Sequence, residues 1–146
     1  MISVADFMTK DLVTVRESDD LALAESLLKL GGIRHLPVVR ERKLVGILTH
    51  RDVLRCGESG KPAARELPVA DVMTRTPTSV RPATGLAHAA RLMLERKYGC
   101  LPVCEEDGTL VGIVTEADFV RFAADVVRDL DIVADAVRAQ DRTGDA

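Results

Sequence analysis

Two short stretches of the sequence place a threonine hydroxyl three residues before a carboxylate. Thr49 and Asp52 end the phrase Gly-Ile-Leu-Thr-His-Arg-Asp, and Thr115 and Asp118 hold the same places in Gly-Ile-Val-Thr-Glu-Ala-Asp. Each phrase begins with a short apolar run typical of a buried strand end, and a Thr that follows such a run is a good helix N-cap. The sequence therefore predicts that a helix opens at each Thr, with each Asp in its first turn. The Asp carboxylate would then lie beside the unpaired amides of the helix start, and this position suits a polar ligand.

The three cysteines offer a weaker chemical signal. Cys100 and Cys104 lie in Cys-Leu-Pro-Val-Cys, which is typical of a strand, so their sulfurs would share a face but lie roughly 13 Å apart. That separation is too large for a shared metal ion or a disulfide, and we interpret both as small buried hydrophobes. Nothing beside Cys56 marks it as reactive. No catalytic triad, P-loop or metal-ligand spacing is present in the sequence, so we expect no enzyme activity and no metal.

Composition limits the kind of protein further. The chain has 146 residues, 47% hydrophobic and 29% charged, a formal charge of −3 and a pI near 5.6. These values are typical of a globular protein, and the overall negative charge does not favour nucleic acid as a partner. No apolar run approaches the ~20 residues that cross a bilayer, so we expect no membrane role of its own. The cysteines and the lack of a signal peptide favour a reducing cytoplasm.

The elements that would position these residues occur twice. Val-Ala-Asp-Phe-Met-Thr at 4–9 matches Val-Ala-Asp-Val-Met-Thr at 69–74, and Leu-Pro-Val at 36–38 matches the same triplet at 101–103, each 65 residues later. After the next turn the offset becomes 66, because the second copy has gained one residue there. Two copies at this period indicate a tandem duplication. We expect the two repeats to form a closed pair and not an extended repeat array.

Each copy is predicted to form a β-α-β-β-α unit. The first would contain a helical turn at 4–8, a strand at 13–15, a helix at 21–30 capped by Asp19 or Asp20, strands at 35–39 and 44–48 around a charged turn at 40–43, and a helix from Thr49 to about Gly57. The second would contain a strand at 78–80, a helix at 85–96 after a Thr84 cap, strands at 100–104 and 110–114, and a helix from Thr115. The fold class is therefore α/β. The expected domains are residues 1–57 and 69–125, with a linker at 58–68 of Gly, Ser, Pro and mixed charge, and a helical extension at 126–146.

Neither unit alone would bury much surface, so the two should pack sheet to sheet as a pseudo-twofold pair. Apolar residues continue the last helix at spacings of three and four: Phe119, Phe122, Val126, Leu130, Val133 and Val137. A helix extended toward Gln140 would exceed the usual length and needs a partner surface. We expect that surface to be the chain's own module or a second chain.

The sequence motifs, in this order and in both copies, resemble those of tandem CBS domains, the paired arrangement called a Bateman module. They are Asp-x-Met-Thr at 6–9 and 71–74, the two Leu-Pro-Val strands, and Gly-hydrophobic-hydrophobic-Thr-x-x-Asp in both copies, and they cover roughly residues 1–125. The resemblance implies a cytosolic regulatory module that binds AMP, ADP, ATP or S-adenosylmethionine in two clefts between the copies. It implies no required cofactor, a homodimer, and a regulated protein partner that receives the signal.

The resemblance also implies which residues form each cleft. Asp52 and Asp118 resemble the aspartates that hold ribose hydroxyls, and Thr49 and Thr115 resemble the hydroxyls beside ribose or phosphate. The first cleft would combine Thr49 and Asp52 with Arg34, His35, Thr76, Thr78 and Tyr98. The second would combine Thr115 and Asp118 with Asp11, Val13, Ile33, Gly99 and Cys100. The first would have cations and an aromatic ring, whereas the second would have an extra carboxylate and no matched cation, which disfavours a polyphosphate there.

Several alternatives stay open. Each Thr and Asp could serve only as a helix cap and a first-turn dipole partner, and His50 and Arg51 could either contact a phosphate or face solvent. The chain could also be a scaffold or dimerisation protein with degenerate clefts. A metal or redox sensor is a third possibility, which the cysteine spacing weakens.

Overall fold

The computed structural model describes residues 1–58 and 62–144, and the chain divides into two compact units, Met1–Val114 and Thr115–Ala146. We describe each unit by itself. In its described residues the first unit contains two small sheets and three α-helices, and the described part of the second contains one long helix, α4 (Glu116–Gly144). The α/β class predicted from the sequence is confirmed.

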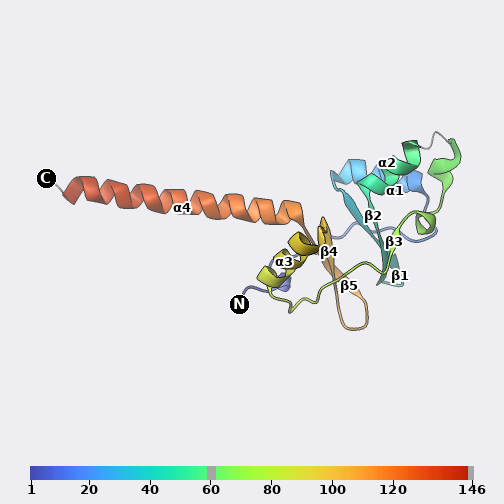
Figure 1. The fold of residues 1–146 in the computed structure, drawn as a ribbon, viewed down its shortest axis with the longest axis horizontal. Helices are drawn as coiled ribbons and strands as arrows, with labels where there is room; N and C mark the ends of the chain where they lie inside the picture. The colour runs from blue at the N-terminus through green and yellow to red at the C-terminus, as the bar shows by residue number, and fades with distance from the viewer. Residues whose placement is uncertain (59–61, 145–146) are drawn as a thin grey trace. The chain divides into compact units, whose positions relative to one another are not determined.

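The first repeat is built around a three-stranded antiparallel sheet in the order β1 (His35–Arg40), β2 (Lys43–Thr49) and β3 (Thr74–Arg75). Helices α1 (Leu21–Gly31) and α2 (His50–Glu58) contact each other and this sheet (Figure 1). The α1 helix begins where Asp20 Oδ1 accepts a 2.8 Å hydrogen bond from the Leu23 amide, and it ends at Gly32, whose φ is 59°. An acidic N-cap and a left-handed glycine are the usual helix boundaries, which is why the sequence located this helix well.

The second repeat has α3 (Leu86–Arg96) and a two-stranded sheet of β4 (Cys100–Cys104) and β5 (Leu110–Thr115). Its hairpin meets that of the first repeat, because Lys43 and Thr109 form a backbone bridge. Short 3-10 helices occupy η1 (Val4–Asp6), η2 (Pro62–Glu66) and η3 (Val69–Asp71). The η2 helix lies in the stretch predicted as an irregular linker.

The segment that begins each repeat pairs with the other repeat. Near the N-terminus, the Val4 amide donates to the Thr84 carbonyl at 2.8 Å. In the same way, the Leu21 amide donates to the Leu67 carbonyl at 3.0 Å. The β3 strand, which follows η3, joins β2 of the first repeat, while Thr9 bridges Ile113 of the second. These two segments, residues 3–9 and 67–75, pair with the opposite repeat, and we call them the exchanged arms. They give the pair its pseudo-twofold organisation.

The arms also complete the core. Val69 and Met73, from the second arm, belong to the same buried cluster as residues of α1, β1 and β2 in the first repeat. Among the most buried members are Leu36, Val38 and Leu48, at the centre of the first sheet. The apolar Leu-Pro-Val and Gly-Ile-Leu runs are therefore buried because the other repeat's arm covers them.

The strands predicted at 13–15 and 78–80 are reduced to single parallel bridges, Val15–Val38 and Val80–Val103. The Val15 amide donates to Pro37 O at 3.1 Å and the Val80 amide donates to Pro102 O at 3.0 Å. The next bond of each ladder would need the Pro amide as donor. Proline has no N–H, so neither ladder extends back toward Val13 or Thr78.

One of the predicted helix caps differs in the structure, and two are confirmed. Gly85, not Thr84, is the N-cap of α3, because the Thr84 hydroxyl accepts instead from the Arg81 amide at 3.1 Å in the preceding turn. Thr49 and Thr115 are the helix N-caps that the sequence predicts. Each is the last residue of its strand, β2 or β5, its hydroxyl accepts from the amide of the first-turn Asp, and the helix begins one residue later. The last helix reaches Gly144, which lies within the helical extension predicted at 126–146.

Candidate functional site

The Thr49–Asp52 pair forms a reciprocal cap at the start of α2. The Thr49 amide donates to Asp52 Oδ2 at 2.9 Å, and the Asp52 amide donates to Thr49 Oγ1 at 3.1 Å. Both residues are half-buried. This is a capping box, which satisfies two amides that a helix start would otherwise leave open. Among the described residues, none donates a hydrogen bond to Asp52 Oδ1, so one carboxylate oxygen can accept from a ligand.

The matching pair, Thr115 and Asp118, has the same box with one difference. The Thr115 amide donates to Asp118 Oδ2 at 2.9 Å, and Asp118 Oδ1 is bound by Arg121 Nη1 at 3.2 Å. Within the described residues, Arg55, the counterpart of Arg121, makes no such bond to Asp52. The two aspartates are therefore unequal, because the outer oxygen of Asp118 is already paired.

The residues predicted to line the first cleft all lie in the first unit, and the structure joins them in small groups. Arg34 and His35 come at the start of β1, where the Arg34 carbonyl accepts from the His50 amide at 2.8 Å. This bond brings the beginning of α2 against the Arg34 backbone. The Arg34 side chain is exposed, as are His50 and Arg51.

Thr78 and Tyr98 share a hydrogen bond of 3.0 Å between Thr78 Oγ1 and the Tyr98 hydroxyl. Tyr98 lies just after Lys97, the left-handed residue that ends α3, and it is half-buried. Among the described residues, no direct bond joins this pair to Asp52 or Thr49. The two groups are therefore separate parts of the predicted cleft.

His35 lies against Gly99, which comes from the second repeat. A Cβ atom built on Gly99 would be 2.8 Å from His35 Nε2, closer than real Cβ contacts allow. A side chain at position 99 would therefore require the imidazole of His35 to shift. The sequence assigned these two residues to different clefts, and the structure brings them together.

The register of β3 against β2 places Thr74 nearer than Thr76 to the end of β2. Thr74 pairs with Ile47, two residues before Thr49, whereas Arg75 pairs with Gly46, so the chain moves away from Thr49 as it approaches Thr76. Thr76 has a φ of 49°, a rare conformation for a β-branched residue. Thr74 lies nearer the end of β2, and the duplicated Met-Thr motif, which also contains Thr9, is the sequence feature that marks this position.

The residues predicted for the second cleft are divided between the two units. Val13, Ile33, Gly99 and Cys100 belong to Met1–Val114, whereas Thr115 and Asp118 begin the other unit. Burial raises the pKa of the Cys100 thiol to about 12, and it also raises the pKa of Cys104. Both thiols are thus held neutral, which agrees with their interpretation as small buried hydrophobes. No group of His, Cys, Asp and Glu in the described residues could hold a metal ion.

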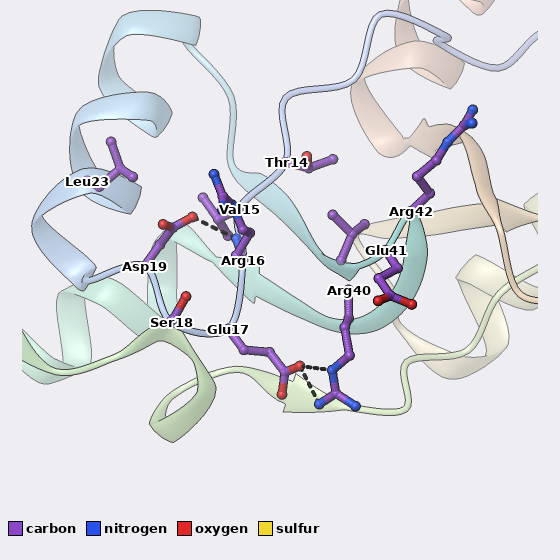
Figure 2. A pocket seen from close by; sticks show the side chains of 11 residues that line it. Thr14, Val15, Arg16, Glu17, Ser18, Asp19, Leu23, Arg40, Glu41 and Arg42 are labelled. Atoms are coloured by element: carbon purple, nitrogen blue, oxygen red, sulfur yellow. Dashed lines mark hydrogen bonds and ion pairs between the residues drawn. The ribbon is translucent and has the colours of Figure 1, made fainter.

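A hollow of about 810 Å³ lies between the loop at 14–19 and the hairpin turn at 40–42 (Figure 2). Glu17 Oε1 accepts from Arg40 Nε at 2.7 Å, and Asp19 Oδ2 accepts from the Arg16 amide at 2.7 Å, so two of its acids are engaged by the protein. None of the residues predicted for either cleft lines it. The hollow is therefore distinct from the candidate site.

The exchanged arms and the repeated capping box define a duplicated α/β module, with the same helix cap in each of its two copies. The CBS domain family matches residues 4–58 and again residues 69–125. The chain belongs to the CBS-domain family and carries a tandem pair of these domains.

Two curated relatives are similar to this chain over most of its length. Inosine-5'-monophosphate dehydrogenase of Korarchaeum cryptofilum is 40% identical over 112 residues, which span 77% of this chain but only 22% of that protein. The CBS domain-containing protein YhcV of Bacillus subtilis is 35% identical over 119 residues, which span 81% of this chain and 83% of YhcV.

Three solved structures share the fold. AcuB from Vibrio cholerae has a TM-score of 0.81 and 39% identity, covering 90% of this chain and 96% of AcuB. Arabidopsis thaliana CBSX2 in complex with AMP has a TM-score of 0.75 and 36% identity, covering 85% and 97%. The CBS domain pair of protein MJ0100, in complex with 5-methylthioadenosine and S-adenosyl-L-methionine, has a TM-score of 0.76 and 27% identity, covering 85% and 97%.

Proposed function

We propose that the chain is a regulatory module that binds an adenine nucleotide or a related adenosyl ligand between its two CBS repeats and signals occupancy to a protein partner. The observation that carries this proposal is the half-buried Asp52, whose Oδ2 completes the capping box while its Oδ1 stays open to a donor. A carboxylate oxygen in that position can accept from ribose hydroxyls, and the adjacent helix start favours a phosphate. The complexes of CBSX2 with AMP and of the MJ0100 pair with S-adenosyl-L-methionine support the ligand class.

The first cleft is the stronger candidate. We assign ribose binding to Asp52 and Thr49, and phosphate binding to Arg34, His50 and Arg51. To the predicted lining residues His35, Thr76, Thr78 and Tyr98 we add Thr74, because it pairs beside the end of β2. The second cleft, with Thr115 and Asp118, would bind more weakly because Arg121 already occupies Asp118 Oδ1.

The wider biology follows from this assignment. We propose that residues 1–57 and 69–125 are the two working domains, that residues 58–68 link them and 126–146 extend them, and that the chain acts without catalysis. A cytoplasmic homodimer would transmit the ligand-induced change to the regulated protein, provided that the ligand binds one arrangement of the repeats more tightly than another. In the described residues, no helix is long and apolar enough to cross a bilayer.

Isothermal titration calorimetry of the full chain with AMP, ADP, ATP and S-adenosylmethionine tests the proposal, with GMP as the control for the base. We expect at least one adenosyl compound to bind and GMP to bind at least about tenfold more weakly. A chain that is folded by circular dichroism but gives no heat with any of these compounds would contradict ligand sensing. That outcome would favour the alternative of a scaffold with degenerate clefts.

A further inference from the structure

Thr76 has a left-handed backbone that no turn or helix end explains. Among the described residues other than glycine, a positive φ occurs at four positions: Glu41, Arg42, Thr76 and Lys97. Glu41 and Arg42 form the two-residue turn of the β1–β2 hairpin, which requires this conformation at both positions. Lys97 follows the last residue of α3, where a left-handed residue commonly ends a helix. Thr76, with a φ of 49°, follows β3 instead and belongs to neither class.

The left-handed conformation of Thr76 opposes the preference of its own sequence. Threonine is β-branched and rarely adopts a positive φ, and a residue that precedes a proline, as Thr76 precedes Pro77, favours an extended backbone. Asp11 holds the equivalent position in the first repeat and has no positive φ, although aspartate tolerates one better than threonine does. Contacts outside this residue must therefore hold Thr76 in its conformation.

Those contacts anchor the chain on both sides of Thr76, and each side is anchored to a different repeat. Two residues before it, Thr74 pairs with Ile47 in the sheet of the first repeat. Two residues after it, Thr78 Oγ1 shares a hydrogen bond of 3.0 Å with the Tyr98 hydroxyl in the second repeat. Thr76 is therefore the joint at which the chain passes from the first repeat to the second.

The joint must also reverse the direction of the chain. The β3 strand runs along β2 away from Thr49. The chain must then come back toward this end of β2, because Thr78 is bonded to Tyr98. The residue after Tyr98, Gly99, lies against His35, which pairs with Thr49 across β1 and β2. The left-handed bend thus lets one side of the joint stay on β2 while the other side reaches the Thr49 end of the first cleft.

We propose that Thr76 is a strained joint that controls how often the Thr78–Tyr98 side of the first cleft opens. In the closed form, Thr76 is left-handed and the hydrogen bond between Thr78 and Tyr98 is made, as in this structure. In the open form, Thr76 relaxes to an extended backbone and this hydrogen bond breaks. Threonine disfavours the left-handed form by about tenfold relative to a residue that adopts it readily, so the joint itself favours opening.

The ligand that the proposed function assigns to the first cleft would contact Thr78 and Tyr98, so its effect on the joint rests on that function. Such a ligand binds the closed form and must offset the strain at Thr76. The free chain therefore opens for ligand exchange, and the occupied chain stays closed. A residue at position 76 that accepts the left-handed backbone should consequently tighten binding, whereas the loss of a ligand contact would weaken it.

Tyr98 reports the opening directly, because it is the single tyrosine of a chain that has no tryptophan. Acrylamide quenching of its fluorescence in the full chain, without ligand, measures how accessible the side chain is. We expect Thr76→Asn and Thr76→Gly each to lower the quenching constant by about twofold or more, because both new residues adopt the left-handed backbone readily. Thr76→Val should not lower it, because valine is β-branched as threonine is. Arg42→Gly is the matched control, since it relieves a left-handed residue at the end of β1 opposite to His35 and should leave the quenching constant unchanged.

Calorimetry with AMP on the same variants tests the effect on the ligand. We expect Thr76→Asn to bind AMP about threefold or more tightly than the wild type, and Thr76→Val to show no such gain. The proposal is overturned if Thr76→Asn and Thr76→Gly leave the quenching constant at the wild-type value. It is equally overturned if Thr76→Asn binds AMP no more tightly than the wild type, or if all three Thr76 variants weaken binding alike, because a lost hydroxyl contact would then explain the residue. Reduced quenching in a chain that binds no AMP in any form would support the joint and contradict the proposed function instead.

Discussion

Met73 of the second repeat's arm lies directly over Gly46 in the first repeat's sheet. A Cβ atom on Gly46 would come within 2.5 Å of the Met73 sulfur and 3.0 Å of the Thr74 carbonyl oxygen. The same relationship recurs between Met8 and Gly112, so each repeat receives a methionine from the other's arm. The glycine of the Gly-hydrophobic-hydrophobic-Thr phrase is therefore the point at which the two repeats fit together.

Gly46→Ala should lower the free energy of unfolding by about 1–3 kcal/mol, because the new methyl group must displace a buried side chain and a backbone carbonyl. Gly112→Ala should lower the free energy of unfolding by less. The three atoms nearest to a Cβ on Gly112 all belong to the half-buried Met8 side chain, which can move. Urea denaturation of the two variants measures the difference. Equal losses would show that the backbone contact at Thr74 does not matter.

The ends of α1 and α3 differ at equivalent positions, where Gly32 has a φ of 59° and Lys97 a φ of 57°. A left-handed conformation costs a residue with a side chain about 1–2 kcal/mol, whereas glycine adopts it readily. Lys97→Gly should therefore raise the free energy of unfolding by about 1 kcal/mol, and Gly32→Lys should lower it by a similar amount. Thermal denaturation of both variants checks the opposite signs. A decrease for Lys97→Gly would refute the conformational argument.

Asp52→Asn should weaken AMP binding by about tenfold or more, because the substitution removes a charged acceptor for the ribose hydroxyls. The amide oxygen can still accept from the Thr49 amide, so the capping box and the fold should survive. Asp118→Asn should have a smaller effect, since Asp118 Oδ1 is already bound by Arg121. Calorimetry compares the two, and equal losses would remove the predicted inequality of the clefts. Asp20→Asn, which alters a cap outside the site, is the control.

Cys100 should resist alkylation in the native protein. Burial raises the pKa of its thiol from 9.0 to about 12, so the fraction of thiolate near neutral pH is roughly a thousandfold smaller than in the unfolded chain. Because the unfolded chain loses this proton first as the pH rises above 9, the Cys100 contribution to stability is present below pH 9 and declines toward pH 12. Iodoacetamide labelling followed by mass spectrometry, with and without urea, measures the protection. Rapid native labelling of Cys100 at pH 8 would contradict it.

The sequence was most informative where local rules act. The α1 helix begins after the N-cap Asp20 and ends before Gly32, which has a left-handed conformation. The two Leu-Pro-Val triplets lie in the predicted strands β1 and β4. The reciprocal bonds of Thr49 with Asp52 and of Thr115 with Asp118 also follow from local spacing. The family assignment rested on these repeated marks and is confirmed by the two matched segments.

Features that depend on long-range pairing were less predictable. The β3 strand has only two residues, and its place beside β2 is set by the exchanged arm rather than by its own composition. For this reason the pairing of Thr74 with Ile47 could not be predicted from the local sequence. The strands around Val13 and Thr78 were overpredicted, because their β-branched residues favour strands while a proline in the neighbouring strand prevents the ladder.

The bridge between Thr9 and Ile113 also affects how the chain must fold during its synthesis. About a hundred residues separate the two partners, so the arm made first waits for the last strand of the second repeat before it can pair. At ribosomal rates of about 5–20 residues per second, that interval is on the order of 5–20 s. Until residue 73 has been made, the nascent first repeat also lacks Val69 and Met73 from its core. A truncated transcript that ends in the linker would therefore yield a half-product with an uncovered apolar sheet, a natural substrate for chaperones and proteases.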